Sequence, residues 1–224
     1  MVLAAIAFGL VSAAPVQAPS ETYELPPSDD AWVYPHADDP SRDPFLRVWG
    51  SGGRSVDEPG RTPEDFSYAY LRFDLSPLPK RVKVLEAALL LTHVPNPSFS
   101  AADAERAPLE VRPLAGDFTE KGWNYADSAK VHPDGGKDAL LGAASPKPGA
   151  PDKEFGVTID LLKLGRLPAL LTKALEGERP ALRVALTSAL DPSEAGNRAV
   201  YKVYSKDGPK EFRPTLRLVV ERIP

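Results

Sequence analysis

The chain has 224 residues, a formal net charge of −4 and no cysteine. The acidic balance argues against nucleic acid and anionic membrane surfaces as partners, because both recognise positively charged proteins. The absence of cysteine excludes disulfides, thiolate metal sites and thiol nucleophiles. A chain of this length can bury about 70% of its unfolded surface, so packing alone can stabilise a core.

The N-terminal residues predict a signal for export. They form an apolar run that ends in small side chains and is too short to span a membrane. We place cleavage after Ala13, so that residues 1–13 are the signal peptide, 14–27 a flexible segment and 28–224 the folded domain. The mature protein is then secreted or periplasmic, with no membrane contact. No Lys or Arg precedes the run, so the positively charged region usual in such a signal is missing. The alternative is an apolar first strand or a disordered tail.

Short apolar or alternating segments follow along the chain, separated by loops rich in proline and glycine. They predict nine strands, near residues 31–35, 45–49, 67–75, 84–94, 108–114, 154–160, 181–188, 198–205 and 213–222. Because helices do not alternate with these strands, the pattern predicts an all-β fold. We expect an antiparallel β-sandwich, jelly-roll-like, with one short helix and long loops.

Residues 70–79, with the sequence YLRFDLSPLP, carry the clearest strand pattern of the chain. Leu71 and Phe73 alternate with Tyr70 and Arg72, which is the period of two expected of a strand. The pattern predicts one face in the core and the other face open to solvent or to a ligand.

The next segment, residues 84–94, is almost wholly apolar. Its alanines and leucines also suit a helix. The prolines on either side and the valines at both ends favour a central strand buried on both faces, with Leu89 and Leu91 in the core.

One helix and two long loops complete the prediction. A helix is expected over residues 168–176, because Pro168 suits a first helical turn and Gly177 the position after the last. The long loops cover residues 50–65 and 125–152, and loops of this length are typical of functional sites or of disorder.

Several segments together resemble the DNRLRE-domain proteins, which are related to family 96 carbohydrate-binding modules. They are DAWV at 30–33, FLRV at 45–48, YLRFDLSPLP at 70–79, LEVRPL at 109–114, FTEKGWN at 118–124, VTIDL at 157–161, YSKD at 204–207 and RPTL at 213–216. Phe118 stands where the family usually has Trp, and the closing Ser-Lys-Asp stands in place of Ser-Arg-Glu. The resemblance runs from about residue 28 to 220. It implies a secreted β-sandwich that binds acidic or neutral polysaccharide, or an extracellular domain of another role.

Residues that could carry catalysis are few. The sequence has no nucleophile elbow, phosphate-binding loop, dinucleotide fingerprint or zinc-protease motif. The three histidines, His36, His93 and His132, lie far apart in the sequence, which disfavours a metal centre. Asp74 and Glu120 could form the carboxylate pair of a glycosidase, but an aspartate before a turn more often caps turn amides. We therefore predict a protein that is not an enzyme.

Acidic residues flank the first predicted strand. Asp29 and Asp30 precede it and Asp38 and Asp39 follow it, and carboxylates in loops are the ligands that calcium prefers. Because no EF-hand spacing is present, structural calcium at Asp29 and Asp30 stands beside the alternative of solvated loop carboxylates.

Sugar recognition needs aromatic rings for sugar faces and cationic side chains for hydroxyls or carboxylates, held on a rigid sheet. Such residues occupy outward positions of three predicted strands. The predicted binding residues are Arg47, Trp49, Tyr70, Arg72, Lys202 and Tyr204. The alternative is that they are ordinary solvent-facing residues of strands.

The sequence thus predicts a secreted, non-catalytic carbohydrate-binding module whose partner is a polysaccharide, with a preference for acidic chains because arginine pairs with carboxylates. The alternatives are a structural or adhesive extracellular domain without a sugar site and, less favoured, a polysaccharide-degrading enzyme. Nothing in the sequence identifies a partner protein.

Overall fold

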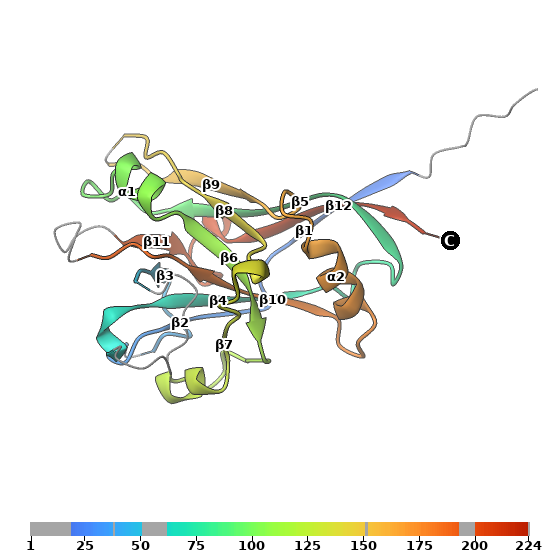
Figure 1. The fold of residues 1–224 in the computed structure, drawn as a ribbon, viewed down its shortest axis with the longest axis horizontal. Helices are drawn as coiled ribbons and strands as arrows, with labels where there is room; N and C mark the ends of the chain where they lie inside the picture. Colours follow the sequence, from blue (N-terminus) through green and yellow to red (C-terminus); the bar gives the residue numbers. More distant parts are fainter. Residues whose placement is uncertain (1–18, 38, 51–61, 151, 193–199, 224) are drawn as a thin grey trace, which may run out of the picture.

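In the residues that the computed structural model describes (19–37, 39–50, 62–150, 152–192 and 200–223), twelve strands form two antiparallel sheets that face each other (Figure 1). The first sheet has the order β1-β12-β5-β11-β3, with β9 also paired to β5. The second has the order β2-β4-β10-β6-β7, with β8 also paired to β6. The predicted all-β sandwich is confirmed. The predicted signal peptide lies outside the described residues.

The strands of the first sheet are β1 (Ser20–Leu25), β3 (Phe45–Val48), β5 (Val82–His93), β9 (Phe155–Asp160), β11 (Tyr201–Tyr204) and β12 (Thr215–Arg222). Those of the second are β2 (Asp29–Val33), β4 (Tyr68–Asp74), β6 (Leu109–Ala115), β7 (His132–Pro133), β8 (Gly142–Ala144) and β10 (Ala181–Thr187). Each of the nine predicted strands is present, with ends shifted by a few residues.

The chain also forms short helices. They are α1 (Ala101–Arg106), α2 (Leu167–Leu175) and the 3-10 turns η1 (Pro63–Asp65), η2 (Tyr125–Ala129), η3 (Lys137–Ala139) and η4 (Lys210–Phe212). The predicted helix over 168–176 is α2, whose proline lies in the first turn. The prediction of a single helix is wrong, because Ser100 caps a second one, α1, through the backbone N–H of Asp103.

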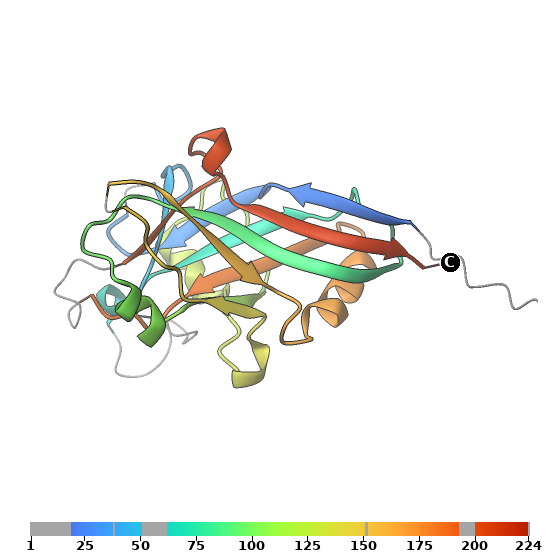
Figure 2. The same ribbon diagram turned by 90° about the horizontal axis from the view of Figure 1, so that it is seen from above.

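Two predictions about unstructured segments are corrected. Residues 20–25, expected to be flexible, form strand β1 and pair with β12, where Ser20 lies opposite Glu221. Figure 2 shows this edge of the first sheet, with β1 and β12 side by side near the C-terminus. The loop predicted over 125–152 contains β7 and β8, both paired with β6. Of the other long loop, residues 51–61 lie outside the described residues.

The apolar segment 84–94 belongs to β5, a strand and not a helix. It pairs with β12 along most of its length, with β9 on the opposite edge and with β11 at His93. These neighbours satisfy its backbone groups, so sheet pairing overrides the helix propensity of its alanines and leucines. Leu89 and Leu91 are buried as predicted, but the other face of the strand is only partly covered, so the expected burial on both faces is wrong.

Two apolar clusters sit on opposite faces of the second sheet. The larger lies between the sheets and contains Leu71 and Phe73, both fully buried as predicted. The smaller covers the outer face of β4, where the segment between β6 and β7 lays Phe118 and Trp123 against Tyr70. The outer face of β4 is therefore covered at Tyr68 and Tyr70, whereas Arg72 is partly exposed and Asp74 is exposed.

The described part of the chain contains no helix that is long and apolar enough to cross a membrane.

Candidate functional site

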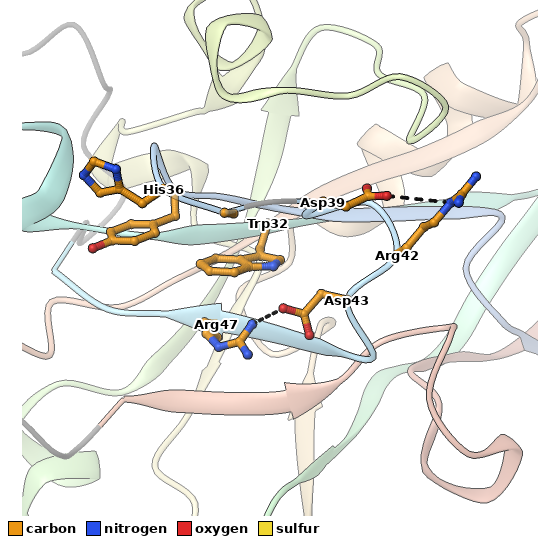
Figure 3. Close-up of a pocket in the computed structure, with 8 residues that line it drawn as sticks. Trp32, His36, Asp39, Arg42, Asp43 and Arg47 are labelled. Carbon is orange, nitrogen blue, oxygen red and sulfur yellow. Dashed lines mark hydrogen bonds and ion pairs between the residues drawn. The ribbon is translucent and has the colours of Figure 1, made fainter.

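The candidate site lies where an edge of one sheet meets an edge of the other. β2 is the edge strand of the second sheet and β3 the edge strand of the first. Trp49, directly after β3, exchanges backbone hydrogen bonds with Ser67 at 2.9 and 3.0 Å, which ties β3 to the chain just before β4. The connection between β2 and β3 borders an open hollow of about 490 Å³ at this junction (Figure 3). Ligand pockets commonly have volumes in this range.

Aromatic rings line one side of the hollow. Trp32 and Tyr34 are stacked, with ring centroids 5.7 Å apart and planes 11° from parallel. Trp49 approaches Tyr34 edge-on at 5.3 Å, and His36 does the same at 5.6 Å. Trp32 forms the floor because it is buried, whereas Tyr34 and Trp49 are partly exposed and His36 is exposed.

A charged pair lies beside the aromatic floor. The guanidinium carbon of Arg47 stands 4.6 Å from the centre of the Trp32 ring, a cation–π contact. Arg47 Nη1 also donates to Asp43 Oδ2. Asp43 is fixed further, because its Oδ1 accepts the Phe45 backbone N–H at 3.0 Å and its main-chain oxygen accepts the Ser205 hydroxyl at 2.7 Å. Arg47 and Asp43 are therefore held in place by contacts within the protein.

A second charged pair closes the rim. Arg42 Nε lies 3.7 Å from Asp39 Oδ2, and the Ser41 hydroxyl donates to Asp39 Oδ1 at 2.7 Å. Figure 3 shows Arg42 and Asp39 on the connection between β2 and β3, on the same side of Trp32 as Asp43. The hollow thus combines aromatic rings with two arginine–aspartate pairs, an arrangement suited to a polar ligand that also has apolar faces.

The structure brings together only part of the predicted binding face. Arg47 lines the hollow, Trp49 contacts its rings, and Lys202 is the cross-strand partner of Arg47. The Lys202 ammonium lies 4.0 Å from the centre of the Phe45 ring, and burial together with the nearby Arg47 lowers the pKa of Lys202. These residues belong to the β3–β11 end of the first sheet.

Tyr204 lies next to this group but is nearly covered. Its ring stacks on Phe212 at 4.8 Å and contacts Phe45 at 5.3 Å, and its hydroxyl donates to Glu154 Oε1 at 3.1 Å. With 9% of its surface exposed, Tyr204 offers little area to a ligand.

The predictions for Tyr70 and Arg72 as parts of the same face are wrong. Both lie on β4 in the second sheet, whereas Arg47 and Lys202 lie in the first. Tyr70 has no exposed surface, because the 118–131 segment covers it, and its hydroxyl donates to the main-chain oxygen of Val131. Arg72 pairs with Asp29 at 2.9 Å.

Protein groups already occupy the proposed calcium ligands. Asp29 binds the guanidinium of Arg72, and Asp30 Oδ2 accepts the backbone N–H of Lys206 at 2.6 Å. Burial raises the pKa of Asp30 to about 7. The described residues contain no group of three or more acidic, histidine or cysteine side chains placed to hold a metal. Asp39 lies at the hollow, and Asp38 lies outside the described residues.

Asp74 and Glu120, the candidate catalytic carboxylates, make structural contacts. Asp74 accepts the backbone N–H and the hydroxyl of Ser76, at 2.9 and 2.8 Å, as a turn cap does. Glu120 Oε1 pairs with Lys206 Nζ at 2.8 Å, and its Oε2 accepts the Asp30 backbone N–H at 3.1 Å.

The histidine of strand β5 is also structural. His93 is fully buried and stacks on Phe155 at 4.6 Å. Its Nδ1 lies 2.7 Å from the main-chain oxygen of Val94, and its Nε2 accepts the Lys202 backbone N–H at 3.1 Å. Burial lowers its pKa to about 4, so the ring is neutral.

Sequence reasoning missed most of the hollow. Trp32, Tyr34, Arg42 and Asp43 were not among the predicted binding residues, although they line it. One signal was available: three aromatic residues, at 32, 34 and 36, occur at every second position, which is the spacing of side chains on one face of a strand. In the structure only Trp32 lies on β2, and Pro35 and His36 lie in the turn that follows.

Comparison with known proteins adds no identification. The sequence matches no protein-family model and no curated protein.

Proposed function

We propose that this chain is a non-catalytic carbohydrate-binding protein that acts outside the cytoplasm and takes a sugar unit in the hollow at the β2–β3 junction. One observation carries the proposal: the Arg47–Asp43 pair is held beside Trp32 and Tyr34. Aromatic rings offer surface to the C–H faces of a sugar ring, and an arginine next to an aspartate offers donors and acceptors to its hydroxyls. The secreted or periplasmic location rests on the composition of residues 1–14.

The resemblance to DNRLRE-domain proteins agrees with this function and remains a prediction from the motifs. The preference for acidic chains loses its original basis, because Arg47 and Arg72 lie on different sheets. We propose no reaction, since Asp74 and Glu120 are engaged by Ser76 and Lys206.

A structural or adhesive domain is the second proposal. It is favoured by three of the segments that resemble DNRLRE-domain proteins, because they are linked to one another inside the fold. Asp30, Glu120 and Lys206 each come from one of these segments and bind one another. On this proposal the shared residues maintain the sandwich, and no sugar is recognised.

The test is a binding measurement on the folded chain without residues 1–13. Affinity electrophoresis against soluble glycans should retard the wild type, and the double variant Tyr34→Ala/Arg47→Ala should lose the retardation. The matched control is Arg217→Ala, which removes an exposed arginine paired with Glu86 on the first sheet at 3.8 Å. Retardation that is equal in the wild type and the double variant would move the site elsewhere, and no retardation by any glycan would favour the structural domain.

A further inference from the structure

We infer that the hollow at the β2–β3 junction selects a neutral sugar with two adjacent hydroxyls over a sugar that carries a carboxylate. The inference rests on the proposed function and deepens it by naming the class of ligand. It is carried by the charge balance of the described residues that line the hollow, by the fixed geometry of the Arg47–Asp43 pair and by an indole N–H on Trp32 that has no hydrogen-bond partner among those residues.

The charges of the described residues that line the hollow balance in pairs. They are two arginines and two aspartates, and each arginine has an aspartate beside it: Arg47 with Asp43 and Arg42 with Asp39. His36 approaches Glu64 at 3.2 Å. A uronate carboxylate that binds the free N–H groups of either arginine would lie close to the aspartate already paired with that arginine. Like charges at such distances repel, and the acidic chain as a whole adds to the repulsion.

The Arg47–Asp43 pair is built to remain intact. Its side chains are only 27% and 20% exposed, and the backbone N–H of Phe45 holds the second oxygen of Asp43. A guanidinium carries five N–H groups and a carboxylate can accept several hydrogen bonds, so both partners keep capacity for a ligand. A sugar hydroxyl donates one hydrogen bond and accepts others. One of two adjacent hydroxyls can therefore accept from Arg47 while the other donates to Asp43, and the ion pair remains intact.

The indole nitrogen of Trp32 supplies an independent observation. Trp32 is 6% exposed, and its Nε1–H has no hydrogen-bond partner among the described residues. Figure 3 shows this nitrogen on the side of the ring that faces Asp43, beside the polar part of the hollow. Buried donors are rarely left unpaired in folded proteins. The nitrogen itself is buried from solvent, so a ligand oxygen next to Asp43 would supply the missing acceptor only if the side chains around the indole moved aside.

The experiment measures binding of the folded chain to matched neutral and acidic glycans by calorimetry. The neutral set contains a β-1,4-glucan, a mannan and a galactan, and the acidic set alginate and polygalacturonate. We expect binding to at least one neutral glycan, with an affinity that changes less than about twofold between 0.05 and 0.5 M salt, because no net charge is neutralised. Oxidation of that glycan by periodate, which cleaves adjacent diols, should abolish binding.

Two variants test the residues. Asp43→Asn should weaken binding of the neutral glycan about tenfold or more, since it removes a charged acceptor. Glu86→Gln, an equivalent change at an exposed residue of β5, should leave the affinity unchanged. Circular dichroism and unfolding midpoints would establish that both variants fold.

The outcomes separate this inference from the proposed function. Salt-sensitive binding to alginate or polygalacturonate that Arg47→Ala abolishes would overturn the neutral selectivity and leave carbohydrate binding in place. Neutral binding that survives periodate or Asp43→Asn would also overturn the inference. If the folded wild type binds no glycan of either set, both proposals fail.

Discussion

The carboxylate of Asp30 on β2 accepts a 2.6 Å hydrogen bond from the backbone N–H of Lys206, just after β11, and so joins the second sheet to the first. The Lys206 ammonium group forms an ion pair with Oε1 of Glu120. The second carboxylate oxygen of Glu120 accepts the Asp30 backbone N–H. The adjacent Ser205 binds the main-chain oxygen of Asp43. A partly buried cross-link between the sheets thus continues to the charged pair of the hollow.

Asp30 should make the stability of the protein fall as pH rises. Burial raises its pKa from 3.8 to about 7, against the opposing effect of Lys206. A carboxyl whose folded pKa lies above its unfolded pKa stabilises the fold when protonated, and this contribution is lost as pH rises from about 4 through 7. Each pKa unit corresponds to about 1.4 kcal/mol, so Asp30 alone should lower the free energy of unfolding by about 3 kcal/mol between pH 5 and pH 8.

The measurement is urea unfolding of the wild type and Asp30→Asn across that pH range. Asn keeps an oxygen for the Lys206 N–H, but it does not titrate, so the variant should lack this decline. Glu105→Gln, at an exposed position of α1, is the control and should follow the wild type. Parallel curves for wild type and Asp30→Asn would mean that Asp30 is not the titrating group.

His93 should act in the opposite direction. Its folded pKa of about 4 lies below the usual 6.5. The neutral ring therefore stabilises the fold above about pH 6.5, and this stability is lost as pH falls toward 4. Nitrogen-detected NMR of the imidazole should find a neutral ring at pH 5.5, with the proton on Nδ1 facing Val94 and Nε2 accepting from Lys202. A protonated ring at that pH would refute the prediction.

The core positions of β4 should be costly to truncate. Phe73 is fully buried between the sheets, so Phe73→Ala should lower the free energy of unfolding by about 3 to 5 kcal/mol. Leu85→Ala on β5 is the control, because Leu85 is 38% exposed and should lose less than about 1 kcal/mol. Denaturant titration of both variants tests the difference, and similar losses would place Phe73 outside the core.

The outer cluster on β4 should depend on the hydroxyl of Tyr70. Tyr70→Phe removes the donor to the main-chain oxygen of Val131 and leaves that oxygen without this partner, so a loss of about 1 to 2 kcal/mol is expected. Because the bond fastens the segment between β6 and β7, limited proteolysis should cut the variant faster in residues 116–131. Cleavage confined to other segments would show that Tyr70 does not hold this one.

The contrast between Phe73 and Tyr70 illustrates what the sequence could predict. Alternation along β4 identified the inward face correctly, because a period of two is a local property of a strand. It could not reveal that Phe118 and Trp123, about fifty residues farther along the chain, cover the other face. What packs on a strand is decided by tertiary contacts, and no local pattern reports them.

The same limit applies to the candidate site. Arg47 and Arg72 both follow the outward pattern, but the assignment of strands to sheets places them apart. Trp32 was treated as part of an ordinary first strand, and its place on the floor of a hollow follows from the meeting of β2 with β3. Strands were predictable from composition and periodicity, whereas the junction between sheet edges was not.

The last prediction concerns Arg47 and Arg72. Each pairs with an aspartate, but only Arg47 lies over Trp32 in the hollow. Arg47→Ala should therefore weaken glycan binding about tenfold or more, since it removes the N–H donors of the Arg47 guanidinium. Arg72→Ala should keep the affinity within about twofold and lower the free energy of unfolding by about 1 to 3 kcal/mol, because Asp29 loses its ion-pair partner. Calorimetry and urea unfolding of both variants separate the two effects. A loss of affinity in Arg72→Ala equal to that in Arg47→Ala would contradict the assignment of binding to the β2–β3 junction.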